Sequence, residues 1–136
     1  MKQLVTQYKL NVPFYDLDPM NIVWHGNYIK YIEEARCDFF SKIGYDYMEM
    51  HKDGFIFPIA KMDFKFIKSA HFGDELVIKT CLKEIEPAIL FKYEVFLKEE
   101  KIFVANSMQI GVKVSTGESF YEAPEKLKNA IEDYHA

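Results

Sequence analysis

Two carboxylates, Asp16 and Asp18, lie two residues apart in the segment 15–28 (YDLDPMNIVWHGNY), which leads into a predicted helix. The start of a helix carries unpaired backbone N–H groups and a partial positive charge, so a carbonyl oxygen held there is polarised as it gains negative charge. A carboxylate across the same pocket could attack the carbonyl carbon, or could deprotonate a water molecule that attacks it. Asp18 is the candidate for this role.

The same two residues also have a structural interpretation. Asp18 precedes Pro19, and an Asp-Pro pair commonly starts a turn in which the carboxylate only accepts hydrogen bonds from backbone N–H groups. Spacing alone leaves both interpretations of Asp18 open. Asp16 is assigned as a loop stabiliser, because the turn at Pro19 breaks the common direction that residues two apart share in an extended chain.

The elements around this segment follow from hydrophobic periodicity. Residues 6–14 alternate polar and apolar side chains, which predicts a half-buried strand. Between residues 28 and 43 the apolar residues recur at helical spacing, with Asn27 as the expected N-cap. At 1.5 Å per residue this helix is about 24 Å long, enough for the main helix of a small domain. Residues 45–57 show a mixed pattern.

Four further alternating runs predict strands at residues 59–68, 76–86, 88–98 and 102–115. Their connections are short, so sequential neighbours are expected to pair antiparallel as a meander. An amphipathic segment from Pro124 predicts a short covering helix. The whole chain, residues 1–136, is therefore expected to form a single α+β domain with one antiparallel sheet of about five strands and one principal helix.

One helix cannot cover both faces of such a sheet, and the two edge strands must also be paired or protected. Self-association meets both needs. We therefore expect a homodimer, or a dimer of dimers, in which edge strands join or helices pack across a twofold axis.

Composition excludes several classes of function. The formal charge of −4 and the pI of about 5.6 argue against broad attraction to nucleic acid or to an anionic membrane, since phosphate contacts need clustered cations. No uncharged apolar run of about 18 residues is present, so no membrane span is expected. Cys37 and Cys81 form no CxxC motif and are expected to be reduced, partly buried thiols, which favours a cytoplasmic location.

Motifs for metal and cofactor binding are also missing. The four histidines show no HxxxH or HExxH spacing. The sequence contains no GxSxG elbow, no Walker loop and no GxGxxG motif. Neither a metal ion nor an organic cofactor is expected.

Two parts of the sequence resemble a known family. The run Asp16-Leu17-Asp18-Pro19, followed by residues 22–28 (IVWHGNY) and a helix that contains residues 34–36 (EAR), is similar to the signature of the 4-hydroxybenzoyl-CoA thioesterase family. This family includes the acyl-CoA thioesterases associated with the Tol-Pal system. Residues 66–70 (FIKSA) and 72–74 (FGD) also resemble the family, so the similarity covers most of the chain.

The resemblance implies a hotdog fold, in which a curled antiparallel sheet wraps a central helix, and a dimer whose sheets join edge to edge. It implies that Asp18 is the catalytic carboxylate, acting as nucleophile or general base. It also implies that the backbone N–H of His25, next to Gly26, polarises the thioester oxygen, and the His25 side chain is a further catalytic candidate. The implied reaction is hydrolysis of a small or medium acyl-CoA to the free acid and CoA, with no cofactor.

Three alternatives stay open. A hydratase or dehydratase of the same fold would use His25 as its base, an acyl carrier protein could replace CoA, and the dimer could bind a ligand without catalysis. Lys61, Lys65 and Lys68 are candidates for binding the phosphates of CoA, although solvated lysines that discourage edge aggregation are the simpler interpretation. Met20 and Asn21 follow the Asp-Pro pair where the family often has small residues, which leaves the acyl length open.

Overall fold

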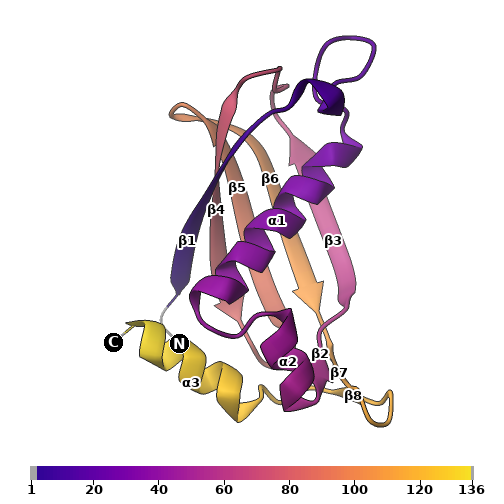
Figure 1. Ribbon diagram of the computed structural model, residues 1–136, viewed down its shortest axis with the longest axis vertical. Coiled ribbons are helices and arrows are strands. Elements are labelled where there is room, and N and C mark those ends of the chain that lie inside the picture. Colours follow the sequence, from indigo (N-terminus) through magenta and orange to yellow (C-terminus); the bar gives the residue numbers. More distant parts are fainter. Residues whose placement is uncertain (1–2, 136) are drawn as a thin grey trace.

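The computed structural model describes residues 3–135 as a curled antiparallel sheet with one long helix, α1, lying across its face (Figure 1). This arrangement confirms the expected α+β class, with five strands in the main sheet. The helix is α1 (Gly26–Lys42), and the strands are β1 (Leu4–Asn11), β3 (Ile59–Phe66), β4 (Glu75–Glu84), β5 (Ile89–Leu97) and β6 (Glu100–Gln109).

The order of the strands in the sheet is β1-β4-β5-β6-β3. The expected meander is therefore correct for β4, β5 and β6 but wrong for β3, which pairs with β6 instead of β4. The edge of β4 that β3 would have occupied is taken by β1, in an unbroken antiparallel register from Leu4↔Leu82 to Asn11↔Glu75. Residues 67–74 consequently cross from one edge of the sheet to the other and pass the N-terminal end of α1 (Figure 1).

The core forms where one face of α1 meets the inward side chains of the sheet. Phe39 packs edge-to-face on Phe91 with ring centroids 4.9 Å apart, and Tyr28 stacks on Phe103 at 4.7 Å. Each large side chain buried in this way stabilises the fold by about 1.5–3 kcal/mol. The helical spacing of the apolar residues is thus explained by their contact with the sheet.

The segment 45–57, whose sequence pattern is mixed, contains helix α2 (Tyr47–Asp53) and strand β2 (Phe55–Ile56). The Asp46 carboxylate caps α2 by accepting from Glu49 N at 2.9 Å, and Gly54 ends it with a φ of 94°. The predicted strand 102–115 is divided, because the chain leaves the main sheet after Gln109. The remaining strands, β7 (Gly111–Lys113) and β8 (Ser119–Phe120), form a second small sheet with β2.

The covering helix at the C-terminal end is confirmed as α3 (Glu125–His135), with Leu127 and Ile131 buried in the core. Both cysteines are free, but Cys37 of α1 is exposed and only Cys81 is partly buried, so the expectation for Cys37 is wrong. Within residues 3–135, none of the helices combines the length and apolar character needed to cross a membrane.

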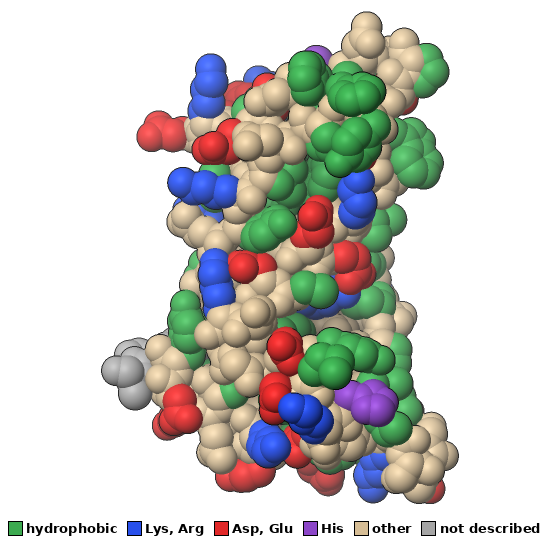
Figure 2. All heavy atoms as spheres, in the orientation of Figure 1, with side chains coloured by type: hydrophobic (Ala, Val, Ile, Leu, Met, Phe, Trp, Pro, Cys, Tyr) green, Lys and Arg blue, Asp and Glu red, His purple; other side chains and the backbone are tan. Residues whose placement is uncertain are grey.

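Strand β3 is an open edge of the main sheet, and its side chains are exposed or only partly buried along its whole length. Phe66 and Ile67 at its end are 53% and 46% exposed. Figure 2 shows hydrophobic side chains gathered over the N-terminal end of α1 and along the side of the molecule on which β3 lies. Surface of this kind is typical of an interface.

Candidate active site

Asp18 opens a tight turn in the loop between β1 and α1. Its backbone N–H donates to Ile22 O at 2.8 Å, and its carbonyl accepts from Asn21 N at 3.0 Å. Asn21 has a φ of 64°, a left-handed conformation that Asn adopts more readily than most residues. The backbone of Asp18 is therefore fixed by hydrogen bonds on both of its polar groups.

Asp18 is partly buried, and the two oxygens of its carboxylate differ in their hydrogen bonds. Oδ1 accepts a hydrogen bond from Met20 N at 2.8 Å, as the turn interpretation predicts. Oδ2 accepts no hydrogen bond from any residue between 3 and 135. One oxygen thus holds the turn, and the other is left to interact with a water molecule or a substrate.

Asp16 points into the protein, where it joins the loop to α1. Its carboxylate is bound by Lys30 Nζ at 2.8 and 2.9 Å and by the Tyr31 hydroxyl at 2.7 Å, and its carbonyl accepts from Trp24 N at 3.0 Å. Burial and the hydrogen bond to Asp16 raise the pKa of Tyr31 above its usual value. These contacts confirm Asp16 as a loop stabiliser.

Helix α1 begins at Gly26, two residues earlier than expected, with His25 as its N-cap. The expected cap, Asn27, is wrong, because it lies within the first turn of the helix and its side-chain amide donates to Asp16 O at 2.8 Å, whereas a cap would accept from a helix N–H. The His25 side chain makes no capping hydrogen bond. The backbone N–H groups of His25 and Gly26 donate to no acceptor within the described chain, so the helix start carries two free amide donors.

Gly26 is required by close packing. A Cβ atom at this position would overlap the indole ring of Trp24, which lies against the first turn of α1. The Trp24 ring also lies 5.2 Å from the His25 ring, measured between centroids. The absence of a side chain at Gly26 therefore lets Trp24 fold over the helix start.

Asp18 and His25 line a common pocket of about 180 Å³ at the start of α1. Tyr28 forms part of its wall, and its hydroxyl accepts from Ala70 N at 3.1 Å, while burial raises its pKa. A further bond of 2.9 Å from Val23 N to Ala70 O holds the crossing segment against the loop. The complete lining is Asp18, Ile22, Val23, His25, Tyr28, Phe66, Ile67, Lys68 and Ser69.

The three lysines singled out from the sequence have different positions. Lys68 lines the pocket that contains Asp18, and it forms an ion pair of 2.8 Å with Glu100. Lys61 and Lys65 alternate along β3 with Met62 and Phe64, which pack against the core. They therefore lie on the outer face of the sheet, away from this pocket.

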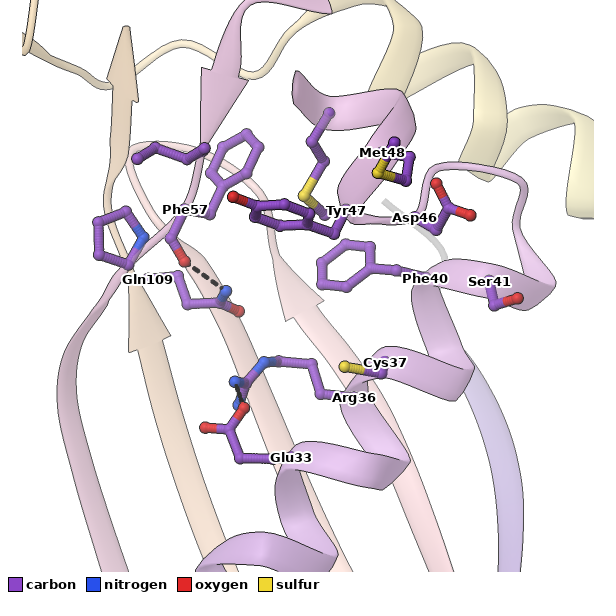
Figure 3. A pocket seen from close by; sticks show the side chains of 13 residues that line it. Glu33, Arg36, Cys37, Phe40, Ser41, Asp46, Tyr47, Met48, Phe57 and Gln109 are labelled. Atoms are coloured by element: carbon purple, nitrogen blue, oxygen red, sulfur yellow. Dashed lines mark hydrogen bonds and ion pairs between the residues drawn. The ribbon is translucent and has the colours of Figure 1, made fainter. Parts of the chain in front are cut away.

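A larger cavity of about 580 Å³ opens beside the second half of α1 (Figure 3). Its walls are mostly apolar and come from α1, from α2 and from the segment 56–58 that precedes β3. The residues that line it are Glu33, Arg36, Cys37, Phe40, Ser41, Asp46, Tyr47, Met48, Met50, Ile56, Phe57, Pro58 and Gln109. No local sequence pattern groups them, because they come from four separate segments: 33–41, 46–50, 56–58 and the end of β6 at Gln109.

Arg36 brings a charge to the wall of this cavity. Its guanidinium forms an ion pair with Glu33 and donates to the Tyr93 hydroxyl at 3.4 Å, and that hydroxyl lies 2.8 Å from Ser107 Oγ. Burial raises the pKa of Tyr93. One signal was available in the sequence: Arg36 follows Ala35 on the helix stripe that otherwise holds apolar residues.

The chain is similar in sequence to known thioesterases. Residues 12–131 match the model of the thioesterase-like superfamily. An acyl-CoA thioesterase of Helicobacter pylori is 30% identical over 86 residues (63% of this chain and 62% of that protein). The 4-hydroxybenzoyl-CoA thioesterase of a Pseudomonas species is 33% identical over 76 residues (54% of each chain).

Solved structures extend the similarity to nearly the full chain. The DHNA-CoA thioesterase of Staphylococcus aureus superposes with a TM-score of 0.80 at 27% identity, covering 96% of this chain and 86% of that one. A protein of Aquifex aeolicus described as hypothetical superposes with a TM-score of 0.85 at 27% identity, covering 92% and 98% of the two chains.

Proposed function

The chain belongs to the thioesterase-like superfamily and has the hotdog fold, and from this premise we propose that it hydrolyses acyl-CoA thioesters with Asp18 as the catalytic carboxylate. The observation that carries the proposal is the pocket shared by Asp18 and His25. It combines a carboxylate oxygen that no described residue binds with a helix start whose first two amides are free.

The reaction follows from these groups. The thioester carbonyl oxygen accepts hydrogen bonds from the N–H groups of His25 and Gly26, which stabilise the negative charge that it gains. Asp18 either takes a proton from the attacking water or attacks the carbonyl carbon itself to form an anhydride that water then opens. In both routes the C–S bond breaks, CoA leaves as the thiolate and is protonated, and the acid is released.

The second part of the proposal is a homodimer through β3, the open edge of the sheet. Two β3 strands pair antiparallel around a twofold axis near the middle of Ile59–Phe66. The Phe66 end, beside the Asp18 pocket, then lies next to the Ile59 end of the partner, beside its larger cavity. The cavity of each protomer thus receives the acyl group of a thioester held by the partner subunit's Asp18.

The length of α1 supports this composite site. Arg36 follows Gly26 by ten residues, which corresponds to about 15 Å along a helix. A small acyl group whose thioester lies at the start of α1 cannot reach that part of the cavity in the same chain. Antiparallel pairing removes the difficulty, because it places the start of one helix beside the second half of the other.

Lys68 is the lysine that we assign to CoA binding. Its ammonium group lies at the rim of the Asp18 pocket and is well exposed, so it can exchange the Glu100 carboxylate for a CoA phosphate. An exposed ion pair of this kind is worth at most about 1 kcal/mol, so its loss on binding costs little.

The test is release of free thiol from acyl-CoA esters of different length and from acyl carrier protein thioesters, followed with a thiol-reactive dye. Because the exposed Cys37 would also react, the assay uses a Cys37→Ser background. We expect Asp18→Asn to lower kcat on the order of 100-fold or more. The matched control is Asp133→Asn, which makes the same change on the exposed face of α3.

Near-normal turnover by a folded Asp18→Asn variant would remove Asp18 from the mechanism. A hydratase is the second candidate, because the exposed His25 ring borders the same pocket. A hydratase releases no thiol, so its activity is followed as loss of the conjugated double bond of an enoyl-CoA, and loss of that activity in His25→Ala but not in Asp18→Asn would favour this chemistry. If thioesters stay intact and enoyl-CoA is not hydrated, the protein is a ligand-binding dimer.

A further inference from the structure

Gln109 places an unpaired polar atom in the wall of the larger cavity. The residue is 5% exposed, and its Nε2 donates to Phe57 O at 2.7 Å. Its Oε1 is buried and has no hydrogen-bond partner within the described chain. An unpaired buried acceptor costs about 1–3 kcal/mol, so a group that donates to it is favoured.

The orientation of this amide is fixed by its neighbour. Turning the Gln109 amide over would place Oε1 against the Phe57 carbonyl oxygen, and two acceptors would then face each other. The oxygen must therefore lie on the opposite side, as Figure 3 shows, toward Phe40 and Arg36. The polarity of this position is consequently set by the fold.

Arg36 supplies the complementary donors. Its side chain is 9% exposed, and only two of its five N–H groups donate to described residues, one to Tyr93 and one to Glu33. This part of the cavity wall therefore combines the remaining N–H donors of Arg36, the Gln109 acceptor and a positive charge that Glu33 balances.

We propose that Gln109 and Arg36 form a polar subsite for an acyl group that carries a hydroxyl away from its thioester carbon. The hydroxyl donates to Gln109 Oε1 and accepts from the Arg36 guanidinium, while Phe40, Tyr47 and Phe57 contact the rest of the acyl group. Since Oε1 is closed to solvent, the Gln109 side chain must turn slightly toward the free space of the cavity. This inference rests on the proposed thioesterase function and names its substrate class.

Other polar groups fit this subsite less well. A carboxylate would face the Gln109 oxygen and the negative charge of Glu33, and an ammonium group would face the Arg36 guanidinium. A purely apolar acyl end would leave Oε1 and the spare N–H groups unpaired. A hydroxyl both donates and accepts, and it brings no charge.

The experiment compares two matched pairs of substrates: 4-hydroxybenzoyl-CoA with benzoyl-CoA, and 6-hydroxyhexanoyl-CoA with hexanoyl-CoA. We expect kcat/KM to be on the order of tenfold higher for the hydroxylated member of at least one pair. The pair that shows the preference tells whether the acyl group is aromatic or aliphatic. In Gln109→Leu, the kcat/KM values for the two members of that pair should become about equal. The control is Gln7→Leu, the same change at an exposed position, which should keep the preference for the hydroxylated member.

A binding measurement on the unchanged protein keeps the test independent of catalysis and of variant folding. The probes are 4-hydroxyphenacyl-CoA and phenacyl-CoA, together with the thioethers of CoA that carry a 6-hydroxyhexyl or a hexyl chain. None of these probes has a thioester to hydrolyse. We expect the hydroxylated probe of the preferred pair to bind about tenfold more tightly and to protect Cys37, which lines the cavity, from a thiol reagent.

The outcomes separate the two proposals. Hydrolysis of both members of each pair at equal kcat/KM, with equal binding of the matching thioethers, overturns the subsite and leaves the thioesterase function standing. A preference that persists in Gln109→Leu also overturns it. If no thioester is hydrolysed, the proposed function fails, and tighter binding of a hydroxylated thioether with Cys37 protection still supports the subsite.

Discussion

The hydroxyl of Tyr31 donates a hydrogen bond of 2.7 Å to the buried carboxylate of Asp16, which stands two residues before Asp18. Lys30 binds the same carboxylate from the neighbouring position of α1. The loop that carries Asp18 is thereby tied to the helix whose first turn carries His25 and Gly26. The carboxylate and the helix start thus keep one relative position without contacting each other directly.

Loss of this tie should destabilise the protein. We expect Tyr31→Phe to lower the free energy of unfolding by about 1–2 kcal/mol and Asp16→Asn by about 2–3 kcal/mol, because the second change weakens the hydrogen bonds from both Tyr31 and Lys30. Urea denaturation followed by circular dichroism measures both. Asp18→Asn is the comparison, and it should change stability by less than about 1 kcal/mol, since its carboxylate makes one hydrogen bond to its own turn. An Asp16→Asn variant as stable as the unchanged protein would contradict the role given to Asp16.

Gly26→Ala should reduce kcat about tenfold or more, because the new methyl group displaces Trp24 and with it the free amides at the start of α1. Trp24 is the single tryptophan, so its fluorescence reports the displacement directly. The double variant Gly26→Ala/Trp24→Leu removes the overlap and should recover part of the activity. Equal activity of Gly26→Ala and of the double variant would show that overlap with the Trp24 ring does not cause the loss of activity.

Stability should decline as the pH rises above about 10, the usual pKa of tyrosine. Burial raises the pKa of Tyr28, Tyr31, Tyr45 and Tyr93 in the folded protein, so above pH 10 the folded state holds more protons than the unfolded state. The stabilisation is fully present below the unfolded pKa and is lost as pH rises toward the folded values. Urea titrations between pH 8 and 11 measure the decline, and Tyr31→Phe should make it shallower. A free energy of unfolding that stays constant between pH 8 and 11 would contradict the raised pKa of these tyrosines.

A composite active site predicts complementation between two inactive chains. Light scattering should first show a dimer at micromolar concentration. Asp18→Asn removes the carboxylate and Met48→Trp fills the cavity, so each homodimer should be inactive. In an equal mixture half of the dimers are mixed, and each mixed dimer regains one of its two sites, so activity should return to about a quarter of the unchanged level. No return of activity in a mixture shown to exchange subunits, or a monomer in solution, would refute the arrangement.

Local patterns in the sequence were enough to predict α1, the strands of the main sheet and α3, since burial against one face imposes a period of 3.6 or 2 residues. The Asp18 motif likewise placed the carboxylate beside the helix start. The prediction of Asn27 as the cap was wrong because Asn27 bonds to Asp16 instead, a contact between residues 11 positions apart. The pattern of segment 45–57 predicted no helix because α2 is only seven residues long, too short to show a period.

The sequence by itself determined which segments are helical or extended and which carboxylate stands at the start of α1, because these properties depend on residues close together in the chain. Only the tertiary structure decided that β3 pairs with β6, leaving its other edge open, and that Gln109 meets Phe57 and Arg36 meets Tyr93. These pairs are 52 and 57 positions apart. The physical reason is that strand order and cavity walls come from the packing of whole elements, and no local period encodes which elements become neighbours.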